Sequence, residues 1–112
     1  ARFPVPGFGA YGPAKAPVLA LTRPWARELG PHGITVNAVA PGFIDTPMVA
    51  SVPEKVVARF LEQLPARRLG RPEEVAAVYA FLASDLASFL IGAVVGVDGG
   101  LLLLGARPVG RR

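Results

Sequence analysis

Two short apolar segments limit the fold of this chain more than any other feature of its sequence. Residues 33–42 read GITVNAVAPG and residues 93–100 read AVVGVDGG, so both are rich in β-branched residues and both end at glycine. Such runs are typical of β-strands in the interior of a sheet. Because a long helical stretch separates the two segments, the second strand is expected to lie parallel to the first.

Three amphipathic helices are predicted around these strands. The first spans about 11–29 and ends at Gly30-Pro31, the second spans about 51–64 with Ser51 and Glu54 at capping-box spacing, and the third starts near Pro72. On each helix the apolar residues recur on one face: Val18, Thr22, Trp25 and Leu29; Val57, Phe60, Leu61 and Leu64; Val75, Val78, Tyr79 and Leu82.

The resulting order of helix, strand, helix, helix and strand predicts an α/β fold with a parallel sheet. Two parallel strands are too few for a stable sheet. The chain also has 52% hydrophobic residues and a mean hydropathy of +0.44, which is more apolar surface than a domain of 112 residues can bury. We therefore expect residues 1–112 to be a single partial domain of a larger fold, starting part-way along a longer chain, with 101–112 as a tail.

Charge and cysteine content exclude several classes of function. The net charge is +4, but Arg2, Arg107, Arg111 and Arg112 account for the excess, and the body of the chain is neutral. This distribution argues against nucleic acid as a partner. No apolar run is long enough to cross a membrane, and the absence of cysteine excludes thiolate metal sites and is compatible with a cytoplasmic protein. We expect no metal.

Tyr11 and Lys15 are the strongest candidates for chemistry. Four residues apart, they share one face of the first predicted helix. A nearby ammonium group favours the phenolate, so the pair is suited to moving a proton to or from a carbonyl or alcohol oxygen. The spacing alone also fits an ordinary surface pair.

The sequence from Tyr11 to Gly100 resembles the C-terminal half of the short-chain dehydrogenase/reductase family, most closely its β-ketoacyl-[acyl-carrier-protein] reductase type. The resemblance rests on the segments YGPAKAPVLALTRPWARELGPHGITVNAVAPGFIDTPM and GRPEEVAAVYAFLASDLASFLIGAVVGVDGG. It implies a Rossmann-like, doubly wound parallel sheet whose N-terminal dinucleotide-binding strands lie outside this chain. It also implies an NAD(P)-dependent oxidoreductase that uses NADP or NAD on a small carbonyl or alcohol substrate, with an acyl thioester of fatty acid metabolism as one option.

The resemblance gives roles to individual residues. Tyr11 matches the family's acid/base, and Lys15 matches the residue that lowers the pKa of that phenol and binds the nicotinamide ribose. Pro41-Gly42 lies just past a strand, where open α/β sheets bind ligands, and the missing side chain of Gly42 is expected to let the nicotinamide approach.

By the same match the backbone of Ile44 meets the carboxamide, and the Thr46 hydroxyl reaches the pyrophosphate. Without the match, residues 41–46 fit a plain strand-to-loop turn with an Asp-Thr capping pair. Residues 47–64 correspond to the family's substrate lid, Asn37 is expected to be structural, and Asp98-Gly99-Gly100 is expected to form a turn or a subunit contact.

Two departures from the family keep a second hypothesis open. Its glycine-rich phosphate turn and catalytic serine fall before Ala1, and Pro17 and Pro24 interrupt the helix that usually packs against a second subunit in a homo-oligomer. We therefore expect little or no activity from the isolated chain. The alternative is a non-catalytic, truncated or degenerate reductase chain that binds itself or a partner.

Overall fold

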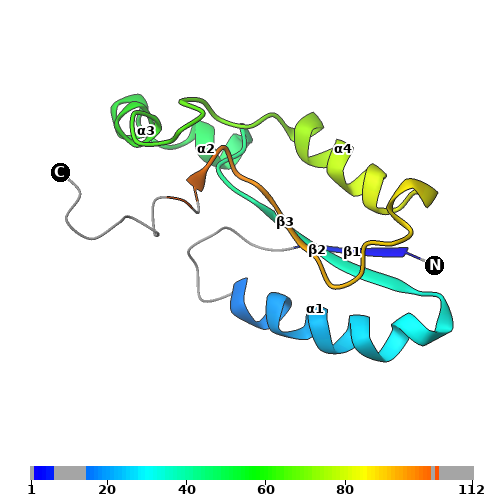
Figure 1. Cartoon of the computed structure of the whole chain (residues 1–112). Helices are drawn as coiled ribbons and strands as arrows, with labels where there is room; N and C mark the ends of the chain where they lie inside the picture. The colour runs from blue at the N-terminus through cyan, green and yellow to red at the C-terminus, as the bar shows by residue number, and fades with distance from the viewer. Residues whose placement is uncertain (1, 7–14, 102, 104–112) are drawn as a thin grey trace.

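The computed structural model describes residues 2–6, 15–101 and 103, and Figure 1 shows how their elements are arranged. Side chains are described from Leu19 onward. The elements in chain order are β1 (Arg2–Pro6), α1 (Lys15–Leu29), the 3-10 turn η1 (Gly30–His32), β2 (Thr35–Pro41), α2 (Pro47–Ala50), α3 (Glu54–Leu61), α4 (Pro72–Leu82), the 3-10 turn η2 (Asp85–Ala87) and β3 (Val94–Val97).

The three described strands form one parallel sheet in the order β1-β2-β3. Ala38 of β2 is in register with Val94 of β3, so both strands predicted from the sequence are present and parallel, as expected. The pattern of the sequence did not indicate β1, because Pro4 and Pro6 argue against a strand. Within the described sheet β1 is an edge strand. Prolines are tolerated there because the backbone groups on the outer side of an edge strand have no neighbouring strand to bond.

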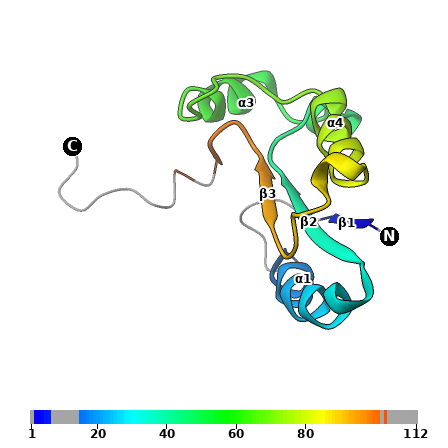
Figure 2. The ribbon, with the colours of Figure 1, turned by 45° about the vertical axis from the view of Figure 1, so that its right-hand side comes forward.

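β2 is buried along most of its length because helices cover both faces of the sheet. Residues 35–40 are all buried, and only Pro41 at the end is half-buried. α1 lies on one face and α4 on the other, as the two views in Figures 1 and 2 show. The near-continuous apolar sequence of this strand therefore follows from burial on both sides.

α1 faces the sheet with small side chains. Thr22 and Ala26, four residues apart, are buried against it, whereas Trp25 is 45% exposed. The prediction that Trp25 belongs to the buried face was wrong, since Ala26 takes that place and allows the helix close to the sheet. The helix continues through Pro24, and Pro24 and Ala20 are both exposed. Water can therefore reach the Ala20 carbonyl, which has lost its intrahelical donor.

The main core lies between the sheet and α4. Val39, Leu82 and Ala87 form its centre, and the residues predicted for the inner face of this helix pack around them: Val75, Val78 and Tyr79. Asn37 joins this core to the turn before β3, because its Nδ2 donates to the Leu90 carbonyl (3.0 Å) and its Oδ1 accepts from the Ala93 amide (2.9 Å). The expectation that Asn37 is structural is confirmed.

The second predicted helix, at about 51–64, is shorter than expected: α3 covers Glu54–Leu61, and the short α2 lies before Ser51. Ser51 follows α2, and its Oγ donates to the Met48 carbonyl at 2.7 Å. α3 begins only at Glu54, with Pro53 at the N-cap and no side-chain capping bond, so the predicted capping box was wrong. The predicted apolar face of α3 is confirmed, since Val57, Phe60 and Leu61 are half-buried and Leu64 is fully buried.

Glycines in the turns give a graded test of this backbone. At Gly100 a Cβ atom would lie 2.5 Å from the Pro65 ring, and φ is +98°, so both the contact and the backbone disfavour a side chain. At Gly33 a Cβ atom would have free space, but φ is +76°. At Gly30 there is neither a close contact nor a positive φ. We expect G100A to lower the free energy of unfolding by about 2 to 4 kcal/mol, G33A by about 1 kcal/mol and G30A by less than about 0.5 kcal/mol. Urea unfolding of the three variants measures this order, and equal losses would contradict the described turns.

Candidate functional site

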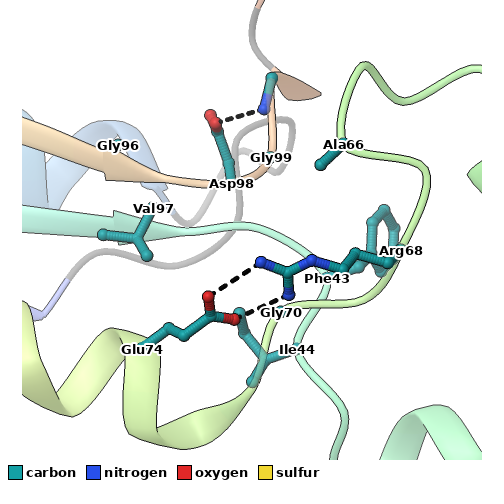
Figure 3. Close-up of a pocket in the computed structure, with 11 residues that line it drawn as sticks. Phe43, Ile44, Ala66, Arg68, Gly70, Glu74, Gly96, Val97, Asp98 and Gly99 are labelled. Atoms are coloured by element: carbon teal, nitrogen blue, oxygen red, sulfur yellow. Dashed lines mark hydrogen bonds and ion pairs between the residues drawn. The ribbon is translucent and has the colours of Figure 1, made fainter.

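The carboxyl ends of β2 and β3 meet at a cavity of about 360 Å³. The Gly42 amide, one residue past β2, donates to the Val97 carbonyl at the end of β3 (3.0 Å), so the two ends are held together. Three segments line the cavity: 43–44 after β2, 66–74 before and within α4, and 96–100 at the end of β3 (Figure 3). In open α/β sheets ligands bind at this edge.

A short bridge closes one wall of the cavity. The Gly70 amide donates to the Phe43 carbonyl (2.9 Å), and the Asp45 amide donates to the Gly70 carbonyl (2.8 Å). Ile44 and Gly70 thereby form an isolated parallel bridge, and a Cβ at Gly70 would lie 2.8 Å from the Ile44 Cδ1 atom. The loop after β2 is thus fixed by backbone bonds, and a side chain at position 70 would have to displace the end of the flexible Ile44 side chain.

An ion pair lies along the same wall. Arg68 donates from Nη1 to Oε1 and from Nη2 to Oε2 of Glu74, both at 2.9 Å (Figure 3). The Arg71 amide also donates to Oε1 (2.9 Å). These hydrogen bonds, above all those from Arg68, lower the pKa of the Glu74 carboxyl to about 2. The carboxylate of α4's first turn therefore stays ionised and anchors the 66–71 loop.

Asp98-Gly99-Gly100 forms a turn above the cavity, in agreement with one of the two predictions made for it. Asp98 Oδ1 accepts from the Gly100 amide (2.9 Å), and both glycines have positive φ. The Ala66 amide donates to the Gly99 carbonyl (3.0 Å). The turn is thus tied to the 65–70 loop, and the side chain of Asp98 organises the turn itself.

The start of α1 lies level with the end of β2. α1 packs on β2 and η1 connects them directly, so they run in opposite directions. Fifteen helical residues span about 22 Å and seven strand residues span about 23 Å, so the two elements match in length. The start of α1, at Lys15, is therefore at the same end of the sheet as the end of β2, at Pro41. Figure 1 shows the first turn of the helix on the side of the sheet where this strand ends. Tyr11 lies outside the described residues.

The other predicted binding residues lie at the end of β2 or directly after it. Pro41 ends the strand, and Ile44 takes part in the bridge to Gly70. A Cβ at Gly42 would lie 2.8 Å from the Asp98 Cα atom, so close packing of the two strand ends, and not only a ligand, demands glycine there. Thr46 occupies the N-cap of α2 but makes no side-chain capping bond, so the alternative capping role does not use its hydroxyl.

Comparison with known proteins identifies the family. The family model described as enoyl-(acyl carrier protein) reductase matches residues 1–102. The 3-oxoacyl-[acyl-carrier-protein] reductase FabG of Thermotoga maritima is 51% identical over 98 residues, which cover 88% of this chain and 40% of that relative. The chain belongs to the short-chain dehydrogenase/reductase family.

Solved structures of this family confirm the predicted α/β fold with a parallel sheet of Rossmann type. A 3-oxoacyl-[acyl-carrier protein] reductase from Brucella melitensis aligns with a TM-score of 0.79 and 40% identity, covering 87% of this chain and 41% of that one. An NAD(P)-dependent gluconate 5-dehydrogenase from Beutenbergia cavernae, described with bound NADP, aligns at 0.75 and 38% identity over 80% of this chain and 37% of that one. This short-chain dehydrogenase/reductase chain thus spans about two fifths of the length of its relatives.

The second tyrosine of this short-chain dehydrogenase/reductase chain is a core residue. Tyr79 packs against the cluster around Leu82 on α4, and burial raises the pKa of its phenol. A proton donor at neutral pH needs a shift in the opposite direction. Of the chain's two tyrosines, Tyr79 is thus used in packing, and Tyr11 stays the candidate for acid/base chemistry.

Sequence reasoning did not find the pair formed by Arg68 and Glu74. The two residues are six positions apart and lie on different elements, so no helical or strand spacing connects them. Locally, Glu74 is only an acidic residue in the first turn of α4, a position that a helix N-terminus favours for negative charge. No helix among the described residues is long and apolar enough to span a bilayer.

The pair predicts a pH-dependent contribution to stability. Because the pKa of Glu74 lies near 2 in the folded protein and near 4.5 ordinarily, its contribution is complete above about pH 4.5 and is lost as the pH falls toward 2. We expect E74Q to lower the urea midpoint clearly at pH 7 and much less at pH 2.5. E73Q, which changes a neighbouring carboxylate with no ion pair in the described structure, is the control. If E74Q lowered the urea midpoint equally at both pH values, this prediction would be contradicted.

Proposed function

We propose that this chain is the C-terminal half of an NAD(P)-dependent carbonyl reductase, a single partial domain over residues 1–112 with a tail at 101–112. The observation that carries the proposal is the placement of Lys15 at the carboxyl end of β2 in a chain of this family. A helix that begins there presents its first turn to the edge of the sheet where a dinucleotide is bound.

In this proposal Tyr11 and Lys15 do the proton work. The phenol of Tyr11 gives its proton to the carbonyl oxygen of the substrate, and the ammonium group of Lys15 lowers the pKa of that phenol. The bound nicotinamide, when present, supplies the hydride to the carbonyl carbon. The products are then an alcohol and the oxidised nucleotide, and in the reverse direction the phenolate accepts the proton.

The cofactor is NADP or NAD. The described residues fit such a group at the end of β2, since Thr46 is half-buried and its hydroxyl makes no capping bond. Pro41 ends β2, and Gly42 and Ile44 lie between it and Thr46 in the sequence. The solved relative with bound NADP supports the assignment.

The substrate class is a small carbonyl compound, and an acyl thioester is favoured. The Thermotoga maritima relative is a 3-oxoacyl-[acyl-carrier-protein] reductase by name. α2 and α3 cover residues 47–61 of the predicted substrate lid, and the loop to Leu64 completes it. We propose that the protein acts in fatty acid metabolism as a cytoplasmic homo-oligomer.

A second candidate is a non-catalytic reductase chain that acts through self-association or a partner. It is favoured by exposed apolar side chains near β3, with Leu86 84% and Phe89 97% exposed. Translation of the DNA upstream of Ala1 separates the two candidates. An in-frame glycine-rich turn and serine favour the enzyme, whereas a stop codon favours the non-catalytic chain.

The isolated 112 residues are proposed to have little or no activity, because they span only two fifths of their relatives. Incubation of the purified chain with NADPH and a 3-oxoacyl thioester tests this. Oxidation of NADPH at ordinary enzyme rates would overturn it.

Replacement of each tyrosine tests the proposed proton donor. In the protein encoded by the complete reading frame, Y11F is expected to lower kcat by about 10²- to 10⁴-fold, because the carbonyl oxygen loses its proton source. Y79F removes a hydroxyl from a core residue and is expected to keep kcat within about threefold. NADPH oxidation followed at 3-oxoacyl thioester saturation measures both, and full turnover by Y11F would contradict the assignment.

A further inference from the structure

One face of α3 carries a groove of about 330 Å³ whose lining comes only from this helix and the turn that follows it. Lys55 and Arg59 lie four residues apart on this face, Gln63 follows just past the end of the helix, and Val56 and Phe60 complete the lining. The groove therefore combines two cations and an amide with apolar surface. Lys55, Arg59 and Gln63 are exposed, and Val56 is 56% exposed.

The two cations of this groove are not neutralised. Neither Lys55 nor Arg59 forms an ion pair within the part of the chain that the structure describes, although Glu54 and Glu62 are close in sequence. Arg68 and Arg71, in contrast, both pair with Glu74. Like charges four residues apart on a helix destabilise it slightly, so this face is built at a small cost to α3.

The groove is adjacent to the candidate site. The Phe60 ring contacts the Phe43 ring edge to face, with centroids 4.3 Å apart, and Phe43 lines the cavity at the strand ends. Along the axis of α3, Lys55 is about 7.5 Å from Phe60, and Arg59 is next to it. A molecule that reached the strand ends past this aromatic pair would therefore have its outer part beside the two cations.

We propose that Lys55 and Arg59 bind the phosphate of a pantetheine arm that carries the acyl thioester. The inference rests on the proposed function and names the part of the substrate that this face holds. A phosphate accepts a bidentate pair of hydrogen bonds from guanidinium and further bonds from ammonium. The dimethyl group next to the phosphate in pantetheine finds apolar contact at Val56 and Phe60. Coenzyme A and an acyl carrier protein share this arm.

A titration tests the subsite without any turnover. In the protein from the complete reading frame, 4′-phosphopantetheine is expected to bind more tightly than pantetheine, which lacks the phosphate. The double variant K55A/R59A is expected to raise the dissociation constant of 4′-phosphopantetheine about five- to tenfold and to leave that of pantetheine unchanged. E62Q, at the C-cap directly after α3, is the control and is expected to keep the preference. Equal affinity of the unchanged protein for the two ligands, or an unchanged preference in K55A/R59A, would overturn the proposal.

Kinetics separate this inference from the proposed function. K55A/R59A is expected to raise KM for a 3-oxoacyl-coenzyme A by about fivefold and to leave KM for the matching N-acetylcysteamine thioester, which has no phosphate, unchanged. Equal increases for both thioesters would show a structural effect and overturn the phosphate site. Absence of reduction of either thioester by the unchanged protein would overturn the proposed function, while the titration still decides the phosphate site. Comparison of the coenzyme A thioester with the carrier-protein thioester identifies the natural source of the arm.

Discussion

The burial of β2 between two helical layers is the constraint on which the rest of the structure depends. Residues 35–40 of β2 are all buried, so the backbone amides and carbonyls of the strand need partners, which come from β1, from β3 and from Gly92 and Ala93 just before β3. Parallel pairing on both sides meets this need and forces the chain to cross over the sheet between β2 and β3. The crossover consists of α2, α3 and α4, which explains why these helices stand between the two strands.

Parallel pairing also gathers separate parts of the chain at one edge. The ends of β2 and β3 lie together because the strands run the same way, and the Gly42 amide bonds to the Val97 carbonyl there. The loop before α4 returns to this edge through Gly70 and through the Ala66 amide, which binds the Gly99 carbonyl. The candidate site is thus a consequence of topology, and its walls are made of backbone bonds that few side-chain changes would remove.

Charge is distributed unevenly around this edge. Glu74 pairs with Arg68 and Arg71 beside the cavity, whereas Lys55 and Arg59 of α3 form no ion pair within the described part of the chain. Charge therefore helps to hold the wall of the cavity, while the exposed face of α3 keeps two unpaired cations. The contact between Phe43 and Phe60 connects the two regions.

The sequence by itself determined the two predicted strands, their parallel arrangement, the inner faces of α3 and α4, and the structural role of Asn37. These follow from local periodicity and from the length of the crossover, which act along the chain. Only the tertiary structure decided the other features. The segment of β1 forms a strand despite its prolines because it lies at an edge of the described sheet. Ala26 and not Trp25 faces the sheet, because a helix approaches a sheet most closely over small side chains, and Gly42 is a glycine because Asp98 lies against it. The pair of Arg68 and Glu74 belongs to this second group, since its residues meet only when the loop before α4 is folded back to the strand ends. Local pattern fixes which element a residue belongs to, while contacts between elements depend on distances that no spacing along the chain contains.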